Sequence, residues 1–179
     1  MSATTRSTAE PKGHYVEKLE ALFAAMKDQH YSEFFKGDVA KAVKTLQLRL
    51  DTMSSYIDRV YEHESLERRI EQEGGADLRD ELESANGRRT AAHNAAMSGL
   101  NVVNRVFAGY GLEPFIEVPE EWDRSQIGEA IAGFVGETFL GQDEPVTRSQ
   151  AAVIAHDTGL THEKRSEQVA ELLQRLSAE

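Results

Sequence analysis

Between residues 38 and 73 the apolar positions recur at alternating spacings of four and three residues. This is the a/d pattern of a heptad repeat, and it is incompatible with a β-strand, whose side chains alternate with a period of two. Asp38 is suited to cap the start of a helix, and Gly74-Gly75 ends the pattern. We therefore predict one long helix, whose apolar positions are Val39, Val43, Leu46, Leu50, Met53, Ile57 and Val60.

The same pattern returns over residues 76–109 and stops at Gly109 and Gly111. Folding the chain back at Gly74-Gly75 places large residues of the first segment opposite small residues of the second. This complementarity lets two antiparallel helices approach closely, so the sequence predicts a long αα-hairpin. The expected facing pairs are Ile57 with Ala92, Met53 with Ala96, Leu50 with Gly99, Leu46 with Val103, Val43 with Val106 and Val39 with Tyr110.

Shorter helices are predicted on both sides of the hairpin. One covers Tyr15 to about His30, and Tyr31, Phe34 and Phe35 follow it as an aromatic anchor. Downstream, Asp123 to Gln126 and Thr147 to Gln150 have the spacing of capping boxes, and a last helix carries Val169 to Leu176. We expect an all-α helical bundle with a disordered tail at 1–13, a body at 14–141, and a helical extension at 142–179 that need not be fixed to the body.

The composition is that of an acidic globular protein. Its 179 residues include 20 Lys and Arg, 31 Asp and Glu and no Cys, for a formal net charge of −11. This charge disfavours a protein that mainly holds a nucleic-acid backbone, and the lack of cysteine excludes disulfides, thiol nucleophiles and cysteine-ligated metals. Because no apolar run approaches a membrane span and Met1–Gly13 lacks a signal-peptide core, we expect a cytoplasmic protein without membrane contact.

The negative charge is concentrated after Gly111, where 5 basic residues face 14 acidic ones. Between Glu113 and Asp123 there are five acidic residues and no basic one. Such a segment is a candidate docking site for a basic protein partner, although a solvated loop that maintains solubility has the same composition.

Metal and nucleotide signatures are weak. No histidine follows an acidic residue at the Glu-x-x-His spacing of di-metal bundles, and there is no glycine-rich phosphate loop. His63 and Glu67 could chelate a metal at i,i+4, but a second histidine is missing. The acidic pairs Glu64/Glu67 and Asp77/Asp80 resemble those of all-α nucleotide pyrophosphohydrolases, yet interleaved arginines make salt bridges the better interpretation. We expect no cofactor.

Residues 155–161 resemble the first half of a DNA-binding helix-turn-helix, with Gly159 at the turn. Such motifs carry an apolar residue six positions after this glycine, where the chain has Arg165 instead. The surrounding region is also acidic, so DNA binding through residues 147–176 is the third-ranked hypothesis and nucleic acid is not an expected partner.

Polar residues that interrupt the heptads are the best site candidates. Glu64 and Arg89 occupy adjoining layers where apolar residues are expected, and an ion pair between them would set the helix register. Neighbouring polar residues could complete a pocket for an anionic or amide-bearing ligand, or could only form interhelical hydrogen bonds and an exposed stripe. The full candidate set is Glu64, Arg89, His93, Tyr56, Asn94, Asn101, Asn104 and Arg105.

The segment from Arg88 to Asn94, with Leu100 to Arg105 and Gly111 to Phe115, resembles an uncharacterised family of small bacterial helical proteins. The resemblance covers about residues 85–140 and implies a bacterial source and a helical fold, but no activity. Our leading hypothesis is a non-enzymatic protein that works through protein–protein contacts as a homodimer, because apolar residues such as Leu48, Leu66 and Phe107 flank the hairpin seam. The alternative is a small-ligand-binding or metal-dependent hydrolytic bundle.

Overall fold

The structure, a computed structural model, describes residues 10–32 and 34–179, which form six α-helices and one short 3-10 helix. No strand occurs in these two ranges, so the predicted all-α class is confirmed. Most of the expected tail, residues 1–9, lies outside the described residues, whereas the Lys12 N–H already donates to the Thr138 carbonyl at 3.1 Å. The helices are α2 (His14–Asp28), α3 (Val39–Glu73), η1 (Ala76–Leu78), α4 (Arg79–Gly109), α5 (Arg124–Phe139), α6 (Arg148–Asp157) and α7 (His162–Ala178).

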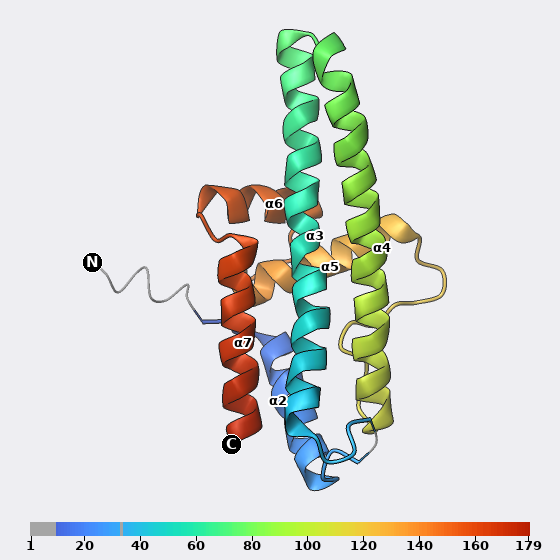
Figure 1. Ribbon diagram of the computed structural model, residues 1–179, viewed down its shortest axis with the longest axis vertical. Coiled ribbons are helices and arrows are strands. Elements are labelled where there is room, and N and C mark those ends of the chain that lie inside the picture. Colours follow the sequence, from blue (N-terminus) through green and yellow to red (C-terminus); the bar gives the residue numbers. More distant parts are fainter. Residues whose placement is uncertain (1–9, 33) are drawn as a thin grey trace, which may run out of the picture.

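Helices α3 and α4 form the predicted antiparallel hairpin, and their connected ends project beyond the other helices (Figure 1). The Asp38 side chain caps α3 by accepting from the Lys41 N–H at 3.0 Å, as expected from the sequence. The turn at Gly74 and Gly75 continues into η1, so α4 begins at Arg79 rather than at residue 76.

Close backbone approach at Gly99 sets the spacing of the seam. A Cβ atom added at Gly99 would lie 3.1 Å from the Arg49 carbonyl oxygen, which belongs to the facing turn of α3. Leu50 and Met53, predicted to face Gly99 and Ala96, are fully buried. Large residues of α3 are therefore buried against small residues of α4 at this level, as predicted. Val39, at the open end of the hairpin, is 36% exposed, so its expected burial was wrong.

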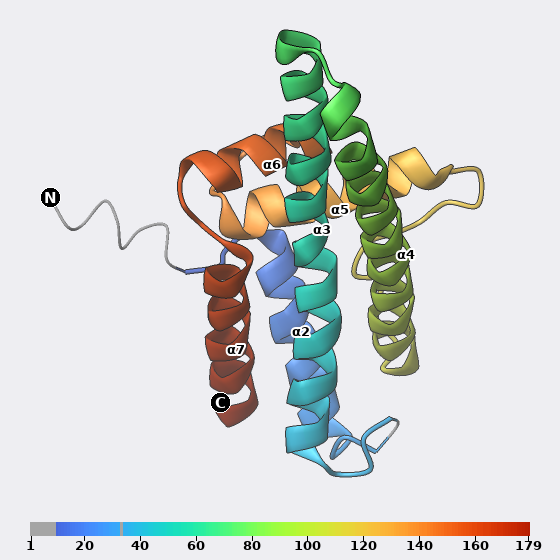
Figure 2. The same cartoon turned by 45° about the horizontal axis from the view of Figure 1, so that its top comes forward.

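The remaining helices pack on α3 and on one another. Helix α7 runs beside the lower half of α3, while α5 and α6 cross the hairpin at mid-height (Figures 1 and 2). Helix α2 contacts α5 and α7, so its buried residues Leu22 and Met26 join the common core. Of the expected aromatic anchor, Tyr31 and Phe35 are buried; Phe34 is 40% exposed and lies beside Tyr110.

A buried arginine joins α7 to α3. Arg165 has no exposed surface, and its guanidinium donates to the Ser54 hydroxyl at 2.7 Å, the Ser54 carbonyl at 3.1 Å and the Asp58 carboxylate at 2.6 Å. A fourth bond reaches the Leu160 carbonyl at 2.7 Å. Arg165 thus occupies the buried position that a helix-turn-helix fills with an apolar residue, but it packs against polar groups of α3. The C-terminal helices are held on the body through this contact.

Within residues 10–32 and 34–179, none of the helices combines the length and apolar character needed to cross a bilayer.

We expect Arg165→Ala to lower the free energy of unfolding by about 2 kcal/mol or more, because it removes the donor of the buried Ser54 hydroxyl, whereas Asp58 is 39% exposed and can bind water instead. Arg175→Ala is the matched control on the same helix, since Arg175 is exposed and pairs only with Glu179 at the C-terminus. Its effect should stay within about 0.5 kcal/mol. Urea denaturation followed by circular dichroism measures both, and equal losses in the two variants would contradict the role of Arg165.

Candidate anion-binding pocket

Three arginines reach one small cavity from three different helices. Arg89 lies on α4, Arg124 begins α5 and Arg148 begins α6. The cavity has a volume of about 130 Å³ and opens to solvent. We call it the arginine pocket; its lining residues are Tyr56, Arg89, Thr90, His93, Arg124, Ser125 and Arg148.

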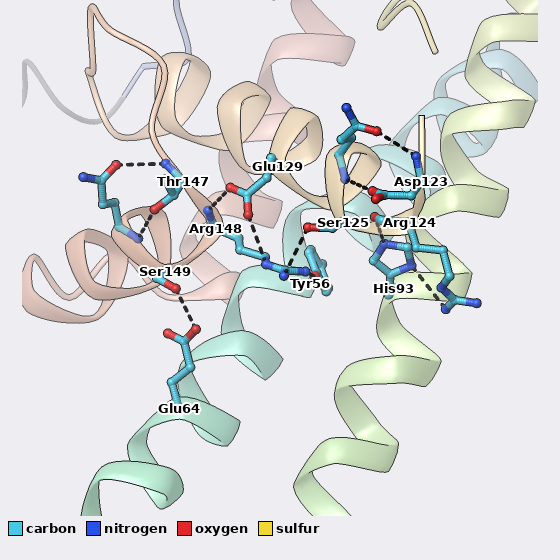
Figure 3. Close-up of polar contacts among 12 residues, drawn as sticks. Tyr56, Glu64, His93, Asp123, Arg124, Ser125, Glu129, Thr147, Arg148 and Ser149 are labelled. Atoms are coloured by element: carbon cyan, nitrogen blue, oxygen red, sulfur yellow. Dashed lines mark hydrogen bonds and ion pairs between the residues drawn. The ribbon is translucent and has the colours of Figure 1, made fainter. Parts of the chain in front are cut away.

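Two of these arginines are positioned by the same local motif. Helices α5 and α6 each start with Arg-Ser-Gln directly after their capping residue, at 124–126 and 148–150. In each case the glutamine side chain and the capping residue complete a capping box, as the sequence predicted. The box fixes the first turn of the helix, so the arginine that opens each turn leaves it in a defined direction (Figure 3).

Arg148 is held on three sides. Its Nη1 donates to the Tyr56 hydroxyl at 3.1 Å, its Nε lies 3.1 Å from a Glu129 carboxylate oxygen, and its Nη2 lies 3.5 Å from the Ser125 hydroxyl. Gly128 allows this arrangement, because a Cβ atom there would lie 3.1 Å from the Tyr56 hydroxyl and 3.4 Å from Arg148 Nη1. The backbone of α5 at Gly128 therefore packs directly against Tyr56 and Arg148.

His93 and Asn94 position Arg124. His93 Nε2 lies 2.9 Å from the Arg124 carbonyl oxygen, which can only accept, so this nitrogen carries the proton. The other ring nitrogen, Nδ1, lies 3.5 Å from Arg124 Nη2, which also donates to the Asn94 side-chain oxygen. His93 packs edge-on against Tyr56, with ring centroids 5.3 Å apart. Nδ1 is therefore the ring nitrogen that faces the Arg124 guanidinium.

The environment of His93 disfavours its protonation. Burial is the main cause and lowers the pKa of the imidazole below its ordinary value of 6.5. The positive charges of Arg124, Arg148 and Arg89 lower this pKa further, and the bond to the Arg124 carbonyl opposes them. His93 is therefore a neutral group in contact with a cationic cavity at neutral pH.

The arginine pocket carries an excess of positive charge. Its lining has three guanidinium groups and, within the described part of the chain, no carboxylate. Glu129 pairs with Arg148, whereas the Arg124 side chain contacts Asn94 and His93, and Arg89 donates to the Asn86 side chain at 2.8 Å. In the described structure neither Arg89 nor Arg124 lies within 4 Å of a carboxylate, in a chain that has 31 acidic residues.

Three of the eight sequence candidates, Tyr56, Arg89 and His93, line this pocket, and Asn94 supports it through Arg124. The expected Glu64–Arg89 ion pair was wrong. Glu64 instead accepts from the Ser149 hydroxyl at 2.6 Å, which attaches the start of α6 to α3. The interhelical ion pair near this level joins Glu62 and Arg88 at 2.8 Å.

The other three candidates lie outside the pocket. Asn101 and Arg105 are exposed on α4. Asn104 has a structural role, because its side-chain oxygen accepts from the Phe115 N–H at 2.9 Å and its nitrogen donates to the Ile116 carbonyl at 2.9 Å. This contact fixes the loop from Glu113 to Asp123, whose five acidic side chains are exposed. Docking of a basic partner on these side chains stays a prediction.

The weak metal candidates do meet, since His63 Nδ1 lies 3.4 Å from a Glu67 carboxylate oxygen. No group of three or more histidine, aspartate or glutamate side chains suited to a metal ion occurs within residues 10–32 and 34–179. The acidic pairs that resemble those of nucleotide pyrophosphohydrolases thus do not gather into such a group in this part of the chain.

A comparison with known protein families shows to which family the chain belongs. Residues 14–139 match the family described as protein of unknown function (DUF3232). The chain belongs to this family. The expected resemblance to an uncharacterised family is confirmed, and the DUF3232 match extends it from about residue 85 back to residue 14. No curated protein and no solved structure matches the chain.

The DUF3232 match includes α2 to α5 and therefore most of the pocket lining, whereas Arg148 lies beyond the matched residues. Sequence reasoning missed Thr90, Arg124, Ser125 and Arg148. The signal that could have identified three of these four is the repeated Arg-Ser-Gln at the two capping boxes.

The pKa of His93 predicts an acid-sensitive fold. Because folded His93 binds a proton less readily than unfolded His93, the unfolded chain gains protons first as the pH falls below about 6.5. The wild type should therefore lose stability between pH 7 and pH 5 by at most about 1.4 kcal/mol per pH unit from this group. His93→Gln keeps a donor for the Arg124 carbonyl but cannot titrate, so this variant should lose less stability than the wild type between pH 7 and pH 5. Urea denaturation in chloride buffers measures both, and parallel pH profiles would contradict the prediction.

Proposed function

We propose that this protein binds a small ligand through an oxyanion, a phosphate or a carboxylate group, in the arginine pocket. The observation that supports this most directly is that Arg89 and Arg124 line one cavity without a carboxylate partner in the described structure. Guanidinium groups pair with planar or tetrahedral oxyanions through two parallel hydrogen bonds. A cavity lined by charges of one sign also concentrates counter-ions, even in a protein of opposite net charge.

The size of the pocket supports a small group. A volume of about 130 Å³ is below the roughly 300–1,000 Å³ of sites that enclose a drug-sized ligand. It is enough for a few water molecules or one oxyanion, with the rest of the ligand in solvent. The binding half of the alternative hypothesis is thus the function that the geometry supports best, and hydrolysis is not part of the proposal.

Binding of oxyanions is expected to depend on Arg89 and not on arginines elsewhere on α4. Inorganic phosphate, sulfate, succinate and citrate are suitable probes in isothermal titration calorimetry at low ionic strength. Arg89→Gln should weaken the tightest of them by about tenfold, which corresponds to about 1.4 kcal/mol for one charge-assisted contact. Arg105→Gln, an exposed arginine on the same helix but outside the pocket, should change the affinity less than about twofold.

Two results would contradict the proposal. One is that none of the four probes binds or raises the melting temperature. The other is that Arg105→Gln weakens binding as much as Arg89→Gln, because the attraction would then come from general surface charge.

Self-association is a second candidate, supported by one exposed apolar side chain. Leu48 on α3 is 59% exposed, and Val102 on α4 is half-buried. The other apolar residues that suggested a dimer, including Leu66, Leu100 and Phe107, are buried by the helices of the chain itself. A homodimer would therefore use the open face of the hairpin around Leu48.

If this face holds two copies together, the wild-type chain should elute with the mass of a dimer in size-exclusion chromatography with light scattering at about 100 µM. Leu48→Glu should shift it to the monomer, because a charge at the centre of an apolar contact is costly to bury. Val153→Glu is the control, since Val153 is 38% exposed and belongs to α6 rather than to the hairpin. A monomeric wild type at this concentration would rule out the dimer.

A further inference from the structure

We propose that the oxyanion is a doubly charged phosphate, either inorganic phosphate or the terminal group of a small phosphate monoester, in preference to a carboxylate. This inference rests on the proposed function and specifies its ligand class. The arrangement of donors and the charge of the pocket both support it.

The donors come from too many directions for a carboxylate. Arg89 approaches from α4, Arg124 from the start of α5 and Arg148 from the start of α6. A carboxylate presents two oxygens in one plane, which one or two guanidinium groups already occupy. A phosphate presents three terminal oxygens that diverge, so each can accept from a different helix.

Neutral donors extend the same arrangement. Thr90 and Ser125, which carry hydroxyl groups, line the pocket beside the arginines. The first turn of α5 also has backbone N–H groups without intrahelical partners, and only the Gln126 N–H among them is used by the capping box. Free N–H groups at the start of a helix are a common feature of phosphate sites. The hydroxyl and N–H donors together suit an acceptor with three oxygens.

The charge of the pocket matches two negative charges. Three guanidinium groups line it, and Glu129 neutralises one of them through its contact with Arg148. His93 is neutral at neutral pH, because burial lowers its pKa below the ordinary value. The remaining charge of the lining is therefore about +2. Glu64 is not part of the lining, and its carboxylate accepts from the Ser149 hydroxyl.

The matched probes for this inference are phenyl phosphate and benzoate, which share a ring and differ in the oxyanion, together with sulfate and inorganic phosphate. At about pH 8 we expect phenyl phosphate to bind at least tenfold more tightly than benzoate. Between pH 8 and pH 5 phenyl phosphate should lose affinity because its second pKa is about 6. Sulfate stays doubly charged over this range and should keep or gain affinity, since an anion beside His93 favours its protonation.

Thr90→Val provides a test within the pocket, because it removes a hydroxyl at nearly constant volume on the exposed side of α4. We expect it to weaken phenyl phosphate severalfold and benzoate less than twofold, as only the third oxygen needs this donor. Ser98→Ala on the same helix, outside the pocket, is the control and should change neither affinity.

The outcomes separate this inference from the function on which it rests. Equal or tighter binding of benzoate would overturn the phosphate assignment and leave oxyanion binding intact. Binding of inorganic phosphate but not of phenyl phosphate would support the assignment and identify free phosphate as the ligand. No binding of any probe, including sulfate, would overturn both.

Discussion

The packing of α3 against α4 determines where every other element lies, because α3 is also the helix on which α5, α6 and α7 rest. Two long helices can stay in register only if their backbones keep one spacing, and at Gly99 that spacing is too small for most side chains. The hairpin therefore fixes the positions of the helices that pack on it. Tyr56 and Arg148, which are far apart in the sequence, meet because Tyr56 belongs to α3 and α6 packs on α3.

The hairpin was predictable from sequence because its information is local. A heptad repeat and a matching repeat in the next segment report which residues face each other, without reference to the rest of the chain. Helix starts were predictable for the same reason, since Asp123 and Thr147 bond to residues three positions ahead. The burial expected from the repeat was wrong at Val39, where the hairpin has reached its open end.

The pocket was only partly predictable, because part of its lining comes from α5 and α6. The heptad pattern of the hairpin does not indicate how these two helices pack on it. Tyr56, Arg89 and His93 attracted notice as polar residues beside an apolar seam. Arg124 and Arg148 look like ordinary first-turn residues of two helices, and only the crossing of α5 and α6 turns them toward one cavity. Likewise, Glu64 was assigned to Arg89 because its true partner, Ser149, belongs to an element whose position the repeat does not report.

The buried arginine of α7 affects how the chain can assemble. Contacts within the hairpin are close in sequence, whereas Arg165 and Ser54 are 111 positions apart, so the hairpin can form well before α7 is in place. Until then, the face of α3 that receives α7 carries a hydroxyl and a carboxylate, at Ser54 and Asp58, among its apolar positions. Those groups hold water, and a hydrated face does not adhere to another unfinished chain as an apolar one does. In the folded chain the Arg165 guanidinium takes the place of that water as the partner of both groups.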